Sequence, residues 1–148
     1  MGNLTLDDIL VTQLHSIDTP GGNVSHALKD TDPGFVGFGE AYFSRIKHDS
    51  IKAWKCHSAM TSNLVVAVGK VKFVFCLRAS LGESVFREEI VLASHPKRIT
   101  VPPGIWFGFR GLSTEESLIL NIANLKHNPS EVLRLDFENI NYDWTNNH

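Results

Sequence analysis

The sequence predicts an antiparallel β-sandwich or barrel, and three observations lead to this fold class. From Asp30 onward, short apolar runs are separated by Gly, Pro, Asn and Ser, as in β proteins. Helix signals are scarce, and an acidic turn at Asp7 and Asp8 is the one candidate. The expected strands follow one another closely without helical patterns between them, which favours sandwiches and barrels.

The strands are expected in the following order. Residues 4–14 form either a helical turn or a strand that leads into the domain. Residues 41–46 alternate, with Tyr42, Ser44 and Ile46 on one face. The other expected strands are residues 52–57, 64–68, 71–77, 88–92, 98–101, 105–109 and 117–124.

Two connections carry strong turn signals. Gly69 separates two apolar runs, so residues 68–70 predict a tight β-turn. The Pro-Pro-Gly string at 102–104 predicts a rigid corner between two strands, because proline restricts φ and glycine permits conformations that other residues avoid.

The length of 148 residues and the mass of 16.5 kDa fit one domain. We expect residues 1–30 to form an N-terminal arm, residues 31–127 a β-barrel and residues 128–148 a C-terminal wrap. The tail carries no strong strand pattern, so we expect an irregular structure there.

Composition excludes several functional classes. The 14 Lys and Arg residues against 16 Asp and Glu give a net charge of -2, which argues against nucleic-acid binding. The longest apolar run, residues 64–68, is far too short to span a membrane. The start MGNLTLDDIL lacks the basic and apolar regions of a signal peptide. Cys56 and Cys76 fit neither a disulfide framework nor a zinc pattern. We therefore expect a reduced, cytoplasmic protein, either an enzyme or a binding module.

The string ITVPPGIWFGF at 99–109 resembles the second motif of the cupin superfamily, and residues 52–69 stand in the place of the first. The chain is similar to the dTDP-4-dehydrorhamnose 3,5-epimerase family of nucleotide-sugar cupins, in its shorter branch. The matching motifs, spread between Asp32 and Trp144, are GEAYFSRI at 39–46, IKAWKCH at 51–57, PPGIWFGF at 102–109, NPSE at 128–131 and YDW at 142–144. The resemblance implies a cupin (jelly-roll) antiparallel β-sandwich barrel with its site inside the barrel mouth. It also implies a homodimer that shares N-terminal strands such as residues 4–14.

The cupin metal positions predict no metal site. They correspond to Lys55, His57, Ser62 and Phe107, of which one is a good ligand. An ammonium group repels a cation, and a phenyl ring has no lone pair to offer. The resemblance also implies no metal or other cofactor, because the family's epimerases do not need one.

The family's catalytic positions are largely replaced. In the family, a His held by an Asp deprotonates carbon beside a ketone, a Tyr returns the proton on the other face, and an Arg and a Lys bind substrate. Aligned on the motifs, the base corresponds to Lys55, the Arg to Lys52, the Lys to Asn63 and the Tyr to Leu120 or Asn121.

Three functions remain open. The leading hypothesis is a metal-independent epimerase or isomerase of a nucleotide-linked 4-keto-6-deoxy sugar, in bacterial polysaccharide or deoxysugar biosynthesis. The others are a sugar 3,4-ketoisomerase and a non-catalytic cupin that binds a sugar nucleotide or a partner enzyme.

Lys55 and His57 are the candidate catalytic residues. They lie two apart on an expected strand, so both should point into the barrel while Cys56 faces away. A lysine in an apolar barrel can lose its proton and act as a base. In the competing interpretation Lys55 pairs with Glu40, and His57 is a structural histidine. The candidate substrate-binding residues are Lys52, Asn63, Glu40, Trp106 and Asn121, although strict alternation places Lys52 on the opposite face unless the strand bulges.

Overall fold

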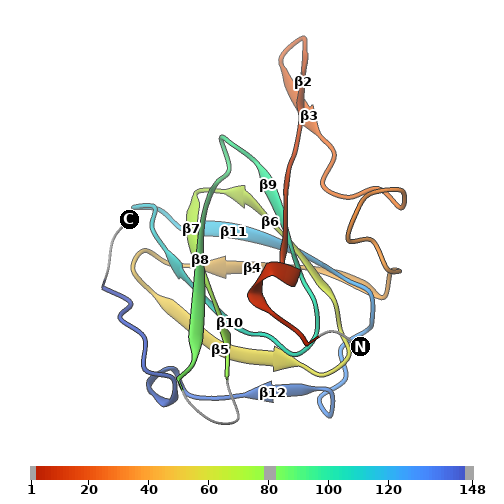
Figure 1. Ribbon diagram of the computed structural model, residues 1–148. Coiled ribbons are helices and arrows are strands. Elements are labelled where there is room, and N and C mark those ends of the chain that lie inside the picture. Colours follow the sequence, from red (N-terminus) through yellow and green to blue (C-terminus); the bar gives the residue numbers. More distant parts are fainter. Residues whose placement is uncertain (1–2, 79–82, 146–148) are drawn as a thin grey trace.

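The protein is a sandwich of two five-stranded antiparallel sheets (Figure 1). The computed structural model describes residues 3–78 and 83–145. The first sheet has the order β1 (Leu10–Gln13), β9 (Lys97–Val101), β6 (Ser62–Val68), β11 (Ser117–Ala123) and β4 (Glu40–Ile46). The second has the order β12 (Val132–Arg134), β5 (Ile51–His57), β10 (Trp106–Gly111), β7 (Lys70–Leu77) and β8 (Val85–Leu92). The neighbouring strands in both sheets are antiparallel, which confirms the predicted all-β sandwich.

The N-terminal segment contains both structures that the sequence left open. A 3-10 helix, η1 (Leu6–Asp8), is capped by the side chain of Thr5, which accepts a hydrogen bond from the backbone of Asp7. Strand β1 follows and pairs with β9 of the same chain. The sequence did not predict the hairpin of β2 (Ser16–Thr19) and β3 (Gly22–Ser25), which projects from the sandwich in Figure 1.

Two glycine corners carry the chain from one sheet to the other. Gly69 has a φ of 90°, and a side chain there would collide with Ser117. The chain bends at Gly69 as it passes from β6 to β7. The predicted tight β-turn between paired strands is not formed, because β6 and β7 belong to different sheets. Gly104, with a φ of 96°, stands at the equivalent crossing between β9 and β10.

Apolar side chains pack on both faces of the second sheet. The core between the sheets consists of Ile9, Ile46, Leu64, Val66, Val71, Phe73, Phe75, Val91, Ile99, Val101, Ile105, Phe107 and Ile119. A second cluster on the opposite face consists of Trp54, Val74, Cys76, Ile140 and Trp144.

The C-terminal tail therefore covers the outer face of the second sheet. It is more ordered than the sequence predicted, because it contains β12 and a second 3-10 helix, η2 (Phe137–Asn139). Across residues 3–78 and 83–145, no helix has the length and apolar character needed to cross a bilayer.

Candidate functional site

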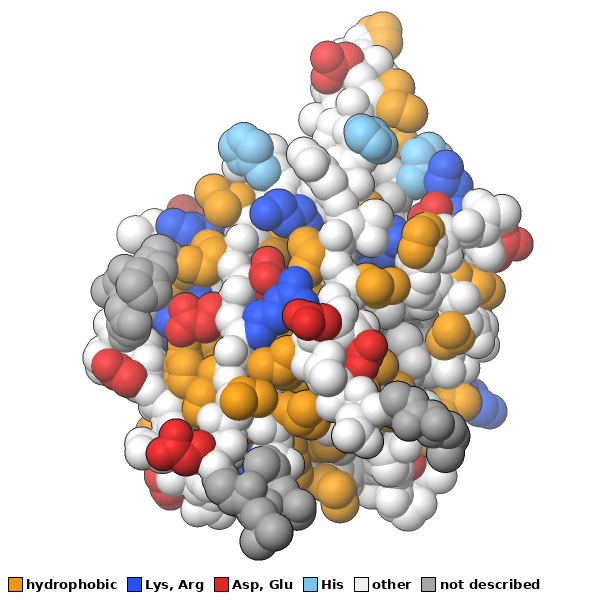
Figure 2. Space-filling model, in the orientation of Figure 1, with side chains coloured by type: hydrophobic (Ala, Val, Ile, Leu, Met, Phe, Trp, Pro, Cys, Tyr) orange, Lys and Arg blue, Asp and Glu red, His pale blue; other side chains and the backbone are white. Residues whose placement is uncertain are grey.

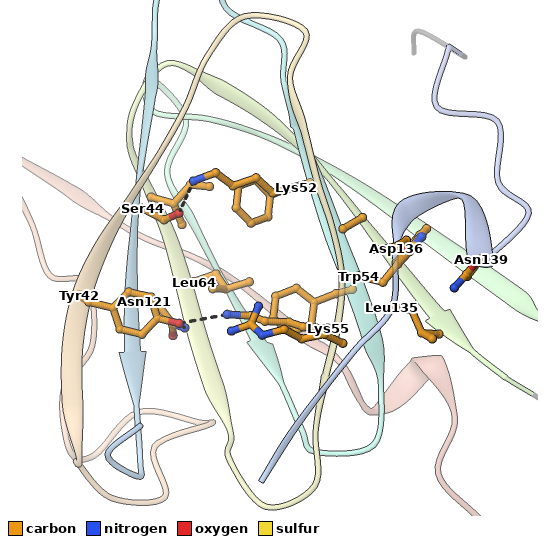
Figure 3. A pocket seen from close by; sticks show the side chains of 15 residues that line it. Tyr42, Ser44, Lys52, Trp54, Lys55, Leu64, Asn121, Leu135, Asp136 and Asn139 are labelled. Atoms are coloured by element: carbon orange, nitrogen blue, oxygen red, sulfur yellow. Dashed lines mark hydrogen bonds between the residues drawn. The ribbon is translucent and has the colours of Figure 1, made fainter. Parts of the chain in front are cut away.

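A cavity of about 560 Å³, within the size range of small-molecule sites, is lined by strands of both sheets and by the C-terminal tail. Its lining combines apolar side chains with polar and charged ones (Figure 3). The lining residues are Tyr42, Ser44, Lys52, Ala53, Trp54, Lys55, Leu64, Phe107, Phe109, Ile119, Asn121, Arg134, Leu135, Asp136 and Asn139. Three of the sequence-predicted site residues, Lys52, Lys55 and Asn121, are thus brought together.

A bulge in β5 explains how Lys52 and Lys55 reach the same cavity. Lys52 pairs with Phe109 and Lys55 with Phe107, so two residues of β5 face the single residue Gly108. A Cβ atom on Gly108 would lie 2.5 Å from the Cβ of Ala53. Glycine at this position therefore allows the close approach of β10 that the bulge requires, and the bulge removes the strict alternation that would separate the two lysines.

Tyr42, Asn121 and Lys55 form one polar cluster in the cavity (Figure 3). The Nδ2 of Asn121 donates to the Tyr42 hydroxyl oxygen at 2.7 Å, and the Nζ of Lys55 donates to the same oxygen at 3.3 Å. The Nζ also lies 5.7 Å from the centre of the Phe107 ring. Glu40 is engaged elsewhere, because its carboxylate accepts a hydrogen bond from the backbone of His127.

Further charged groups surround this cluster. Lys52 donates to the carbonyl oxygen of Arg45 at 2.7 Å and lies beside Ser44, at 3.4 Å. Arg134 pairs with Lys55 across β12 and β5, so two basic side chains are adjacent in register. With the carboxylate of Asp136, the cavity has three basic side chains and one acidic side chain, a balance that suits an anionic ligand.

His57 lies next to the cavity lining, where it is paired with Glu131. Its Nδ1 is hydrogen-bonded to Oε1 of Glu131, and its ring centre is 6.4 Å from that of Phe107. Oε2 of Glu131 accepts from the backbone amides of Ala59 at 3.0 Å and Met60 at 2.9 Å. Burial lowers the pKa of His57, although Glu131 opposes this effect. Burial acts to raise the pKa of Glu131, but the hydrogen bonds from His57, Ala59 and Met60 outweigh it and keep the pKa below its usual value.

The structure places the remaining predicted residues away from the cavity lining. Asn63 is buried and bonds to the carbonyl oxygen of Gly34 and the hydroxyl of Thr100. Trp106 packs against the outer cluster of the second sheet, where aromatic side chains more often serve packing than binding. The thiol of Cys56 is buried, as expected, and burial raises its pKa.

No group of three or more His, Cys, Asp or Glu side chains that could hold a metal ion occurs in the part of the chain that the structure describes. The polar groups of the cavity are instead ammonium, guanidinium, amide and hydroxyl donors, with the Asp136 carboxylate. Such donors suit phosphate and sugar hydroxyl groups better than a metal ion.

Sequence reasoning did not select Tyr42, Arg134 or Glu131 as site residues. Tyr42 lies in the GEAYFSRI string, and its alternation with Ser44 was the available signal. Glu131 closes the NPSE string, but its contact with His57 joins residues 74 positions apart, which no local pattern shows. Arg134 lies in the tail, where no strand was expected.

Comparison with known proteins gives structural neighbours only. No protein-family model and no curated protein sequence matches the chain. A dTDP-sugar isomerase from Desulfovibrio desulfuricans G20 superposes with a TM-score of 0.86 at 28% identity, covering 95% of this chain and 92% of that one. A dTDP-4-dehydrorhamnose 3,5-epimerase from Elizabethkingia anophelis NUHP1 gives a TM-score of 0.76 at 16% identity, with coverages of 99% and 86%.

A third neighbour is QdtA, a sugar 3,4-ketoisomerase from Thermoanaerobacterium thermosaccharolyticum in complex with TDP. Its TM-score is 0.71 at 14% identity, with coverages of 90% and 92%. The chain thus has the jelly-roll cupin fold of the dTDP-4-dehydrorhamnose 3,5-epimerases.

Proposed function

We propose that the protein is an epimerase or isomerase of a nucleotide-linked 4-keto-6-deoxy sugar, and that the cavity is its active site. The observation that carries the proposal is the placement of Lys52, Lys55 and Arg134 around one cavity of this fold. The structural likeness to a dTDP-sugar isomerase over nearly the whole chain supports the same substrate class.

The chemistry requires a proton to leave carbon beside a ketone. The resulting enolate carries negative charge on oxygen, which nearby cations and hydrogen-bond donors stabilise. Lys55 is the proton-transfer residue in this proposal, because it lines the cavity and its Nζ lies 5.7 Å from the centre of the Phe107 ring. Lys52 and Arg134 bind the diphosphate, and neither a metal nor an organic cofactor takes part.

His57, the other catalytic candidate, has a supporting role in the proposal. Its Nδ1 is engaged by Glu131 and its side chain is 7% exposed. The pair joins the end of β5 to the segment that leads into β12, and so supports the strand that carries Arg134. We expect the replacement His57→Gln to affect stability more than proton exchange.

The proposal extends to the biological setting. We infer a cytoplasmic homodimer that acts in bacterial polysaccharide or deoxysugar biosynthesis. The projecting β2–β3 hairpin supports the dimer, because Ile17 and Val24 are 54% and 46% exposed and face each other in register. Figure 2 shows hydrophobic side chains on this projection, where a partner subunit would cover them.

The proposal is tested by incubating the protein with dTDP-4-keto-6-deoxyglucose in heavy water. We expect deuterium at C3 or C5 by NMR, and the products distinguish epimerisation from 3,4-ketoisomerisation. Lys55→Met should abolish exchange while calorimetry still detects dTDP binding. Binding without any exchange in the wild type would instead establish the non-catalytic cupin, and absence of both would refute the proposal.

A further inference from the structure

We propose that Tyr42 is the second proton-transfer residue of this site, that it works as one unit with Lys55, and that Asn121 is its positioning residue. This inference rests on the proposed function and deepens it. Tyr42 would supply the hydroxyl group that the site otherwise lacks, because the family's tyrosine position is occupied here by Leu120 or Asn121.

The register of the first sheet places Tyr42 where the missing hydroxyl is needed. Asn121 on β11 pairs directly with Tyr42 on the neighbouring strand β4. Both side chains line the cavity, and the amide nitrogen of Asn121 lies 2.7 Å from the phenol oxygen. The hydroxyl is therefore displaced by one strand relative to the family's arrangement, but it faces the same cavity.

Lys55 reaches this hydroxyl from the opposite sheet. Its Nζ is 3.3 Å from the phenol oxygen, and the two residues are separated by 13 positions in the sequence. The phenol oxygen is the acceptor in both hydrogen bonds, so its own proton is not used in either of them. A tyrosine that is held by two donors and keeps its proton for a bound molecule is arranged for proton transfer.

The surroundings of the pair favour this chemistry. Leu64, Phe107 and Ile119 line the same cavity and surround the pair with apolar side chains. The proposed step uses Lys55 as a free amine and Tyr42 as a phenol. Proton movement between them follows the 3.3 Å hydrogen bond.

The C–H bond beside the ketone breaks, its electron pair forms the enolate, and its proton goes to the Lys55–Tyr42 pair. The pair is then an ammonium group and a phenol, and its added positive charge balances the negative enolate. The phenol returns a proton to the same face of the carbon, because the two groups lie 3.3 Å apart. Exchange of the pair with solvent introduces deuterium in heavy water.

The test compares the only two tyrosines in the sequence. Tyr42→Phe removes the hydroxyl and keeps the ring, and Tyr142→Phe is the matched control, because Tyr142 packs against the outer cluster away from the cavity. With dTDP-4-keto-6-deoxyglucose in heavy water, we expect Tyr42→Phe to slow deuterium exchange about 100-fold or more, the usual contribution of a general acid or base. Binding of dTDP by calorimetry should stay within about 3-fold, which is less than 1 kcal/mol. Tyr142→Phe should exchange at the wild-type rate.

Asn121→Ala tests the positioning role. The phenol loses one of two donors, so we expect a shift in the pH profile of exchange, whereas a purely structural role would change the melting temperature alone. If Tyr42→Phe exchanges as fast as wild type while Lys55→Met is inactive, Tyr42 has no part in proton transfer and the proposed function stands. If the wild type itself exchanges no deuterium, the proposed function fails and this inference fails with it.

Discussion

Replacing Glu131 with Gln tests how a buried carboxylate holds the end of β5 against the C-terminal segment. The carboxylate accepts hydrogen bonds from the His57 ring and from the backbone amides of Ala59 and Met60. Gln has nearly the same size, but its amide has one accepting oxygen and one donating NH₂ group. Either the His57 ring or the two backbone amides must therefore face an NH₂ donor where the wild type has an accepting oxygen.

The structure sets the size of the effect. A hydrogen bond to a charged group contributes about 1.5–3 kcal/mol, and a buried donor left without its acceptor costs a similar amount. We expect Glu131→Gln to lower the free energy of unfolding by about 2–4 kcal/mol. The loss is limited because the Gln side chain keeps one accepting oxygen. For a chain of this size the melting temperature should fall by about 6–12 °C.

The same pair makes stability depend on pH. The folded protein holds the pKa of His57 below its ordinary value of 6.5, because burial disfavours the imidazolium and Lys55 and Arg134 repel it. The pKa of Glu131 is held below its ordinary value of 4.5. For both groups the unfolded chain binds more protons, so stability falls as the pH falls. The contribution of His57 decreases below pH 6.5, and that of Glu131 decreases below pH 4.5.

Calorimetric melting between pH 4 and pH 8 measures both effects. Glu131→Gln should melt lower than wild type at neutral pH. The difference should not narrow until the pH falls below 4.5, because Glu131 favours the charged form of His57 at higher pH and keeps its own charge there. Glu115→Gln, on an exposed turn, is the matched control and should melt like wild type. An unchanged melting temperature for Glu131→Gln at pH 7, or an equal loss in the control, would refute this account of the buried pair.

Three further predictions concern the bulge, the diphosphate and the hairpin. Gly108→Ala should destabilise the protein by about 1–3 kcal/mol in urea unfolding, because the new Cβ would collide with Ala53. Gly22→Ala is the control and should leave the stability unchanged, because there is open space around Gly22. Arg134→Gln should weaken dTDP binding by about 10-fold in calorimetry, the loss of one charged contact, and unchanged affinity would remove Arg134 from the binding site. Ile17→Asp should shift the proposed dimer to monomer in sedimentation, and a dimer that persists would exclude the hairpin from the interface.

Much of the fold could be predicted from the sequence, because strand faces and corners are encoded locally. Alternation on β4 and the glycine at position 69 mark a strand and a turn without reference to distant residues. Whether two consecutive strands pair or separate into different sheets is not local. The sequence therefore indicated a change of chain direction at Gly69, but it did not indicate that the chain crosses there from one sheet to the other.

The candidate site shows the same division. By itself, the sequence determined that the 52–57 segment is a strand bearing Lys52, Lys55 and His57. Alignment with the family narrowed its tyrosine position to Leu120 or Asn121. Tertiary structure alone decided which of these residues share the cavity. The bulge opposite Gly108 turned Lys52 inward, Glu131 engaged His57 from the tail, and Tyr42 met Lys55 between two sheets. The physical reason is that side-chain periodicity is a property of one strand, whereas register, bulges and contacts across sheets depend on packing between segments far apart in the chain.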